Sequence, residues 1–289
     1  MQNSGIKEPV EVPEQDIRYL DHLMKNIDAD LAVSMAYVKR TQGLTFSQLQ
    51  KRFSGINVNT MKRYMQPSYP SMRPLHFLAA YSWVTMVPIT SFYYKILYPN
   101  MDSSLLKVLM CVGKLPSNQF NAVLEILYNL LNESSQKNFL YLKEKLDIQY
   151  DSTHQDPYSF PPSPLDIQKF AVDYYYSVAV TAKKFRENNN ISIETISRVV
   201  GLSQYQYQIL EDTDKSVPFP ASIGARIKLG FKMESHAGFT SEMQLFPEFH
   251  KLRCVQNTRN ILIMELFKLI PPYCKPRIAE ILTSLSNIY

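Results

Sequence analysis

Eight basic side chains stand in one stretch of this 289-residue chain that holds no carboxylate. Between Leu31 and Met101 there is no Asp or Glu, so this stretch carries a charge of +8 and the rest of the chain sums to −3. Lysine and arginine bind a polyanion by neutralising its phosphates, and nearby carboxylates would oppose this. The stretch therefore predicts a phosphate-binding surface, although the same side chains would also serve simply to solvate a surface. They are Lys39, Arg40, Lys51, Arg52, Lys62, Arg63, Arg73 and Lys95.

Residue patterns typical of enzymes and metal sites do not occur in the sequence. The five histidines lack the spacing of paired metal ligands, and the eight glycines form no phosphate-binding loop. The three cysteines are odd in number and far apart, which predicts reduced thiols rather than a disulfide framework. We therefore expect no catalytic activity, no cofactor and no bound metal. The polar N-terminus is unlike a signal peptide, so we expect a cytoplasmic protein.

One uncharged stretch, Pro74 to Tyr94, is long enough to cross a bilayer. It also contains two prolines and several hydroxyl-bearing side chains, which make it less apolar than a typical membrane-spanning helix. We therefore predict no membrane span here, and expect two buried helices that break at Pro88. We expect the first of them to begin at Pro70, because a proline such as Pro74 is tolerated in the first turn of a helix.

Two short helices joined by a tight turn are predicted inside the basic stretch. The spacing of Thr45 and Gln48 is that of a capping box, which predicts a helix beginning after Thr45. Gly55 supplies the positive φ that a tight turn requires. Asn57 is expected to cap the second helix, which turns Met61 towards the core.

The same plan recurs in the second half of the chain. A first helix is expected to open at Ile191, and Gly201 provides the turn that follows it. Ser203 and Gln206 have the spacing of a second capping box. In the helix that this box opens, Tyr207 and Leu210 are expected to face inward.

The two halves also end alike. Leu115-Pro116 and Ile270-Pro271 stand 155 residues apart, and each is followed by a Glu-Ile-Leu sequence within a helical apolar pattern. Alternation typical of strands is weak throughout, so we predict an all-α fold built from a duplicated unit. The predicted parts are a basic helix-turn-helix domain (14–98), a helical subdomain (99–150), a linker (151–164), a second helix-turn-helix domain (165–240) and a C-terminal helical subdomain (241–289).

Both predicted helix pairs resemble the lambda-repressor-like (Xre/Cro-type) helix-turn-helix family. The resemblance covers about Ala32 to Tyr98 and Phe185 to Met233, and follows the pattern G-L-T-x-x-x-L-x-x-x-h-G-h-S-x-x-T-h-x-x-h-E. It implies two tandem domains in which the third of five helices enters the major groove of DNA. The chain departs from the family where Phe46 and Ile193 replace the glutamine that often opens the second helix. An extra residue, Ser54, also precedes the first turn glycine.

The resemblance and the charges together select candidate DNA-binding residues. From Asp166 to Thr240 nine basic residues stand against eight acidic ones, and Glu211, Asp212 and Asp214 follow the second recognition helix, so the second repeat is expected to be the weaker reader. In the first repeat we expect base contacts from Asn57, Val58, Asn59, Lys62 and Arg63, and phosphate contacts from Lys39, Arg40, Lys51, Arg52 and Arg73. In the second repeat the candidates are Gln204, Tyr205 and Gln208.

The sequence thus predicts a transcription regulator that binds double-stranded DNA in a sequence-specific manner. Two units in one chain would mimic a repressor dimer, and a homodimer of the chain would present four. One alternative is an adaptor whose helix-turn-helix scaffolds bind another protein, with Tyr205 and Tyr207 of the second repeat as contacts. Another is an RNA-binding protein, which would expose Tyr64 and Tyr69 for stacking on unpaired bases.

Overall fold

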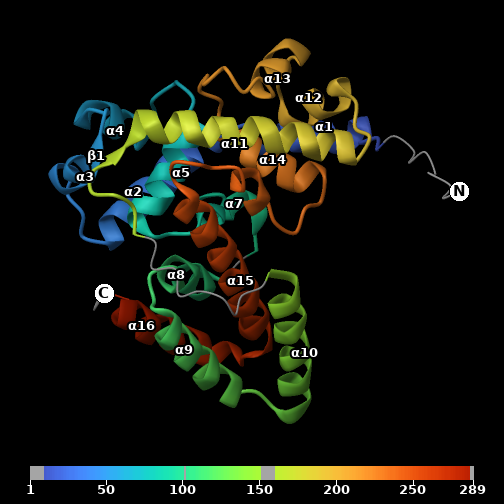
Figure 1. The fold of residues 1–289 in the computed structure, drawn as a ribbon. Helices are drawn as coiled ribbons and strands as arrows, with labels where there is room; N and C mark the ends of the chain where they lie inside the picture. The colour runs from blue at the N-terminus through green and yellow to red at the C-terminus, as the bar shows by residue number, and fades with distance from the viewer. Residues whose placement is uncertain (1–9, 101, 151–159, 287–289) are drawn as a thin grey trace, which may run out of the picture.

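The computed structural model describes residues 10–100, 102–150 and 160–286, and these form a mostly helical fold (Figure 1). Sixteen α-helices occur in this part of the chain, together with short 3-10 helices and a pair of two-residue strands. The predicted all-α class is therefore confirmed. Residues 151–159 of the predicted linker lie outside the described residues.

The first half of the chain begins with two helices and a compact helix pair, and ends with three helices of a separate bundle. Its elements are α1 (Glu14–Leu23), α2 (Ile27–Thr41), α3 (Phe46–Arg52), β1 (Phe53–Ser54), α4 (Val58–Tyr64), α5 (Leu75–Thr85), α6 (Ile89–Phe92), α7 (Tyr94–Leu97), α8 (Ser103–Val112), α9 (Ser117–Asn129) and α10 (Glu133–Tyr150).

The second half follows a similar order around one long helix, α11. Its elements are β2 (Leu165–Asp166), α11 (Ile167–Asn188), α12 (Ile193–Val200), α13 (Gln204–Leu210), α14 (Ser222–Gly230), η2 (Ala237–Thr240), α15 (Pro247–Leu269), η3 (Pro272–Cys274) and α16 (Lys275–Ser286). Figure 1 shows α11 crossing the upper part of the molecule, with α3 and α4 beside its first residues and α12 after its last.

Two hydrophobic cores divide the molecule differently from the predicted domains. One core, which we call the body, combines α2 to α7 of the first half with α11 to α14 of the second. The other, the bundle, combines α8, α9 and α10 with the end of α15 and with α16. The segments 99–150 and 241–289 were predicted as two separate subdomains, but their helices pack against each other in this one bundle (Figure 1). Helices this short bury enough apolar surface only when they share a core.

Aromatic packing joins the two halves within the body. The ring of Trp83 on α5 lies 5.9 Å from that of Phe170 on α11 and 5.4 Å from that of Phe249 on α15. All three side chains are buried. The parallel strands β1 and β2 add a second connection, in which Phe53 pairs with Leu165.

A third connection is reciprocal. The Leu75 amide donates to the Phe219 carbonyl, and the Ala221 amide donates to the Arg73 carbonyl, each at 2.8 Å. Leu75 and Ala221 stand 146 residues apart, as do Arg73 and Phe219, so the two bonds exchange equivalent positions of the two halves. Such an exchange is the local signature of a two-fold relation.

The start of α5 differs from the prediction. The helix begins at Leu75 with Pro74 as its N-cap residue, not at Pro70. The preceding backbone is held out of a helix because the carboxylate of Asp28 accepts from the Arg73 amide at 2.7 Å, and Leu75 is bonded across to the second half. The expected break at Pro88 is confirmed, since α5 ends at Thr85, Met86 follows in the left-handed conformation, and Pro88 is the N-cap residue of α6. Among the described residues, no helix has the length and apolar character needed to span a membrane.

Because both halves share one core, we expect the body to unfold as a single cooperative unit. Trp83 is the only tryptophan of the chain and lies at the junction of the two halves, so its fluorescence monitors the packing there. Its fluorescence and the helical circular dichroism should therefore lose their native values at the same urea concentration. Phe170→Ala should lower the free energy of unfolding by about 3–5 kcal/mol.

The exposed Val172 on the same helix provides the control, since Val172→Ala should change stability by less than about 0.5 kcal/mol. Two separate transitions, with fluorescence unaffected by Phe170→Ala, would show that the halves are independent domains.

Candidate nucleic-acid interface

The helix pair α3–α4 begins and turns where the sequence predicts. The Gln48 amide donates to Thr45 Oγ1 at 3.1 Å and the Thr45 amide donates to Gln48 Oε1 at 2.8 Å, which completes the capping box. Asn57 Oδ1 caps α4 by accepting from the Thr60 amide at 2.8 Å. Gly55 has a φ of +77°, and a Cβ there would also press against α11 at 3.3 Å from Gln168. The turn therefore requires glycine, and its backbone lies close to the first residues of α11.

The two sides of α4 face different surroundings. Met61 is fully buried and Val58 is half-buried against the body core, whereas Asn59, Lys62 and Arg63 are exposed. Tyr64 is half-buried, with its ring 4.8 Å from that of Phe77. The inward orientation predicted for Met61 is confirmed, whereas Tyr64 packs against Phe77 and also lines an open pocket beside α4.

Two lysines from different elements meet over one aromatic ring. Lys39 Nζ, at the end of α2, lies 4.7 Å from the centroid of the Phe46 ring, and Lys62 Nζ, on α4, lies 5.7 Å from the same centroid. The ring attracts both cations, and Lys39 also donates to the Leu44 carbonyl at 3.2 Å. Phe46 therefore holds two positive charges together beside α4. Sequence spacing carries no signal for this arrangement, because it depends on how α2, α3 and α4 pack.

Five basic side chains from α2, α3 and α4 lack a carboxylate partner among the described residues. In the described part of the chain, Lys39, Arg40, Lys51, Lys62 and Arg63 have no carboxylate within ion-pair distance. Four of them are exposed, and Lys39 is half-buried. We call these five residues the basic cluster. Lys95, the last cation of the acid-free stretch, lies apart from it in an ion pair with Asp30.

Arg73 is a clear exception, and its predicted role in phosphate binding is wrong. Its side chain is only 1% exposed. The guanidinium donates to four backbone carbonyls, one from the last residue of α4 and three from the loop between α4 and α5, so it organises that loop from within. The carbonyls belong to Tyr64, Gln66, Tyr69 and Ser71.

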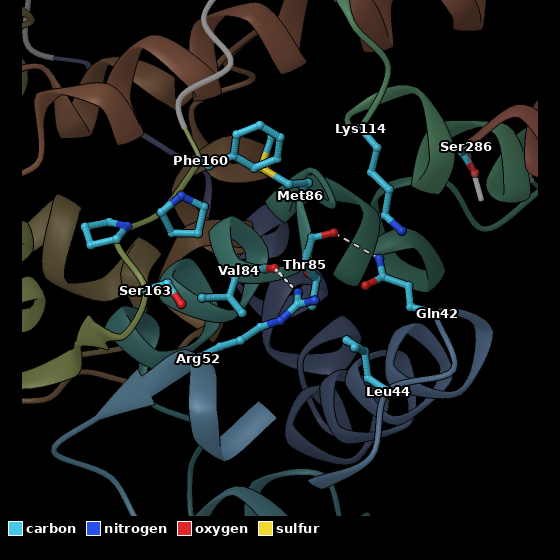
Figure 2. Close-up of a pocket in the computed structure, with 12 residues that line it drawn as sticks. Gln42, Leu44, Arg52, Val84, Thr85, Met86, Lys114, Phe160, Ser163 and Ser286 are labelled. Carbon is cyan, nitrogen blue, oxygen red and sulfur yellow. Dashed lines mark hydrogen bonds between the residues drawn. The ribbon is translucent and has the colours of Figure 1, made fainter. Parts of the chain in front are cut away.

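Arg52 is exposed, but its guanidinium already donates to a backbone carbonyl. It points into a pocket of about 470 Å³, where its guanidinium donates to the Val84 carbonyl at 3.1 Å, while Gln42 donates to the Thr85 carbonyl at 2.9 Å (Figure 2). Lys114, from the turn after α8, lines the same pocket. No carboxylate is among the described residues that line it. Arg52 therefore differs from the freely exposed side chain that was predicted to contact phosphate, because its guanidinium already donates a hydrogen bond inside this pocket.

The second helix pair, α12–α13, has the same construction with a different surface. The Gln206 amide donates to Ser203 Oγ and the Ser203 amide donates to Gln206 Oε1, so the predicted capping box is confirmed. Gly201 has a φ of +75°, and Tyr207 and Leu210 are buried. The exposed side chains of α13 carry no charge, and they are those of Gln204, Tyr205, Gln206 and Gln208.

The acidic residues after α13 would repel DNA phosphates less than the sequence suggests. Glu211 is largely buried and accepts two hydrogen bonds from Arg186, at 2.7 and 2.8 Å. Asp212 pairs with Lys215 at 3.2 Å, and the Asp214 amide and this partner lower the pKa of its carboxyl. Two of the three carboxylates are therefore already neutralised by cations of the chain.

His76, at the start of α5, is half-buried and lies close to a tyrosine hydroxyl. Its Nδ1 lies 3.1 Å from the Tyr175 hydroxyl, and burial lowers its pKa to about 4. Across the residues whose placement is described, no three His, Cys, Asp or Glu side chains gather as metal ligands would.

Comparisons with known proteins identify no relative. No protein-family model matches the chain, and neither a curated protein nor a solved structure shows a significant similarity to it. The case for any function therefore rests on the chemistry of the residues themselves.

Arg73→Met should lower the free energy of unfolding by about 3 kcal/mol or more, because four backbone carbonyls lose their donor inside the protein. The matched Arg63→Met should stay within about 0.5 kcal/mol of the wild type, since Arg63 is exposed. Urea unfolding of both variants measures the difference. Equal losses in the two variants would contradict the structural role of Arg73.

Proposed function

We propose that the chain is a transcription regulator that binds double-stranded DNA in a sequence-specific manner, with α4 as the recognition helix in the major groove. The observation that carries this proposal is the exposed side of α4 within the basic cluster. Asn59, Lys62 and Arg63 point outward from a helix whose other side is locked into the body core. A rigid helix that presents polar and cationic groups to solvent is what direct reading of base edges requires.

The surroundings of α4 suggest separate roles for the side chains. Arg63, with Lys62 and Asn59, is assigned to base edges, since arginine pairs with guanine and asparagine with adenine. Lys39, Arg40 and Lys51 are assigned to phosphates on either side. Asn57 sets the start of α4, because its Oδ1 already accepts from Thr60.

The second helix pair is the counterpart of the first in the other half of the chain. Its turn glycine and its capping residue stand 146 residues after Gly55 and Asn57, and the reciprocal bonds between Leu75 and Phe219 and between Ala221 and Arg73 relate the halves locally by a two-fold. One chain thus offers two equivalent helix-turn-helix units of the lambda-repressor-like kind, and α13 is the weaker DNA reader because it carries no cation. We expect a DNA-binding protein of this kind in the cytoplasm.

Tyr205 favours a second candidate function for the same unit. Its side chain is 70% exposed on α13, between two exposed glutamines. Exposed tyrosine is enriched in protein interfaces, where its ring buries a large area. We therefore propose that α13 contacts a protein partner or a second copy of the chain, which is the adaptor function applied to the second half only.

The DNA proposal is tested by fluorescence anisotropy with random-sequence duplex DNA across a salt series. Wild-type protein should bind at low salt, with an affinity that falls steeply as salt increases. Lys62→Ala/Arg63→Ala should weaken binding by about tenfold or more. Lys137→Ala/Lys145→Ala removes the same charge from exposed positions on α10 and should leave the affinity close to that of the wild type.

If both double variants bind alike, α4 does not contact DNA. If the wild type fails to bind even at low salt, the DNA proposal is wrong and the adaptor function is the next to test for the whole chain.

The two classes of contact within the basic cluster can also be separated. Arg63→Ala should cost about 1–3 kcal/mol on the preferred sequence and relax the preference for one base. Lys51→Ala should weaken binding to all sequences equally and flatten the salt slope by about one. Binding to a panel of duplexes measures both effects. Uniform losses from both variants would show that Arg63 contacts the backbone and not a base.

A further inference from the structure

Arg253 on α15 is a buried cation for which the described part of the chain supplies no carboxylate. Its side chain is 5% exposed, and no Asp or Glu in that part lies within ion-pair distance of it. It donates to the His236 carbonyl at 3.1 Å, and its second bond, to Thr240 Oγ1, is long at 3.4 Å. A buried charge that is neither paired nor well bonded is costly to fold around.

Other buried or largely buried arginines of the body have more or stronger hydrogen-bond acceptors. Arg73 donates to four carbonyls, as described above. Arg186 has both oxygens of Glu211, and Arg226 has Asp21 at 2.7 Å. Arg253 lies over the ring of Phe249, 5.9 Å from its centroid, but among the described residues it has no anionic partner.

A small cavity lies directly beside the Arg253 side chain. Its volume is about 20 Å³, which is room for roughly one or two water-sized particles. It is lined by Pro88, Ile89 and Thr90 from the first half, and by Ser235, His236, Ala237, Arg253, Gln256, Asn257 and Asn260 from the second.

Hydrogen-bond donors without partners gather at this cavity. His236 Nε2 and Asn257 Nδ2 are buried and have no partner in the described structure. Burial and the nearby cations Arg253 and Lys228 keep the pKa of His236 well below its usual value, so its ring is neutral and donates through Nε2–H when that nitrogen carries the proton. Buried polar groups without partners indicate a bound water or ion.

Asn260 completes the lining. Its Oδ1 is also buried without a partner, while its Nδ2 donates to Thr90 Oγ1 at 3.1 Å. Turning this amide over would present Nδ2 to the cavity and let Oδ1 accept from the Thr90 hydroxyl. All these residues line the cavity, and each has a side-chain group that can donate a hydrogen bond.

We propose that this cavity binds a small monovalent inorganic anion of the size of chloride, held by Arg253 together with His236, Asn257 and Asn260. Water would satisfy the donors but would leave the charge of Arg253 uncompensated. The anion would link the loop before α6 to η2 and α15, and so stabilise the junction between the two halves.

The test compares the melting temperature of the full chain in sodium chloride and in sodium gluconate at equal ionic strength. Chloride should raise the wild-type melting temperature by about 2–4 °C in a saturable manner. Arg253→Met and Asn257→Ala should each lose this chloride-specific rise. Lys251→Met removes an exposed cation from the same helix and should keep it.

Bromide soaking locates a bound anion directly. It uses the wild-type protein, so the result does not depend on whether a variant folds. Crystals soaked in bromide should show an anomalous peak within hydrogen-bond distance of Arg253. Equal melting temperatures in the two salts, or a rise that persists in Asn257→Ala, would overturn the proposal. The absence of a bromide peak at Arg253 would show that the cavity holds water only.

Discussion

The packing of Trp83 against Phe170 and Phe249 is the contact on which the rest of the molecule depends. These rings come from three helices that are far apart in the sequence, and they bring both halves of the chain into one core. With the junction in place, the short strands pair and the loops before α5 and α14 bond to each other. The position of α4 relative to α13 is therefore a property of the shared core and not of a flexible linker.

A shared core has a consequence for how the chain would read DNA. In a dimer of separate domains, the spacing between recognition helices adjusts as the domains move, whereas here α3–α4 and α12–α13 belong to one packed body. The two helix pairs keep similar caps and turns but differ in surface charge, since Lys62 and Arg63 are exposed on α4 whereas the exposed side chains of α13 are uncharged. Such a body is suited to strong contact through one unit and a weaker or different contact through the other.

Local features of the structure were predictable from the sequence because neighbouring residues determine them. The capping boxes at Thr45 and Ser203 and the positive φ of Gly55 depend on backbone geometry within a few positions. The exposed side of α4 followed from its apolar period in the same way. These features account for most of the candidate site, including Asn59, Lys62 and Arg63.

Other features depend on partners that are distant in the sequence, and these were missed. Arg73 was expected at the surface. Its backbone amide donates to Asp28 and its guanidinium donates to backbone carbonyls, so its side chain is buried. The position of Phe46 between two lysines depends on the packing of three helices. The merging of the two predicted subdomains into one bundle could not be predicted from apolar patterns, because such patterns show that a helix has an apolar side but not which helix covers it.

The central claim, that α4 contacts DNA directly, is tested most directly by photo-crosslinking. A benzophenone amino acid placed at Asn59 should crosslink to duplex DNA, and competitor DNA and high salt should suppress the crosslink. The same group at Tyr141, which is 73% exposed on α10 of the bundle, should give none. Equal crosslinking from the two positions, or none from position 59, would contradict the assignment of α4 as the recognition helix.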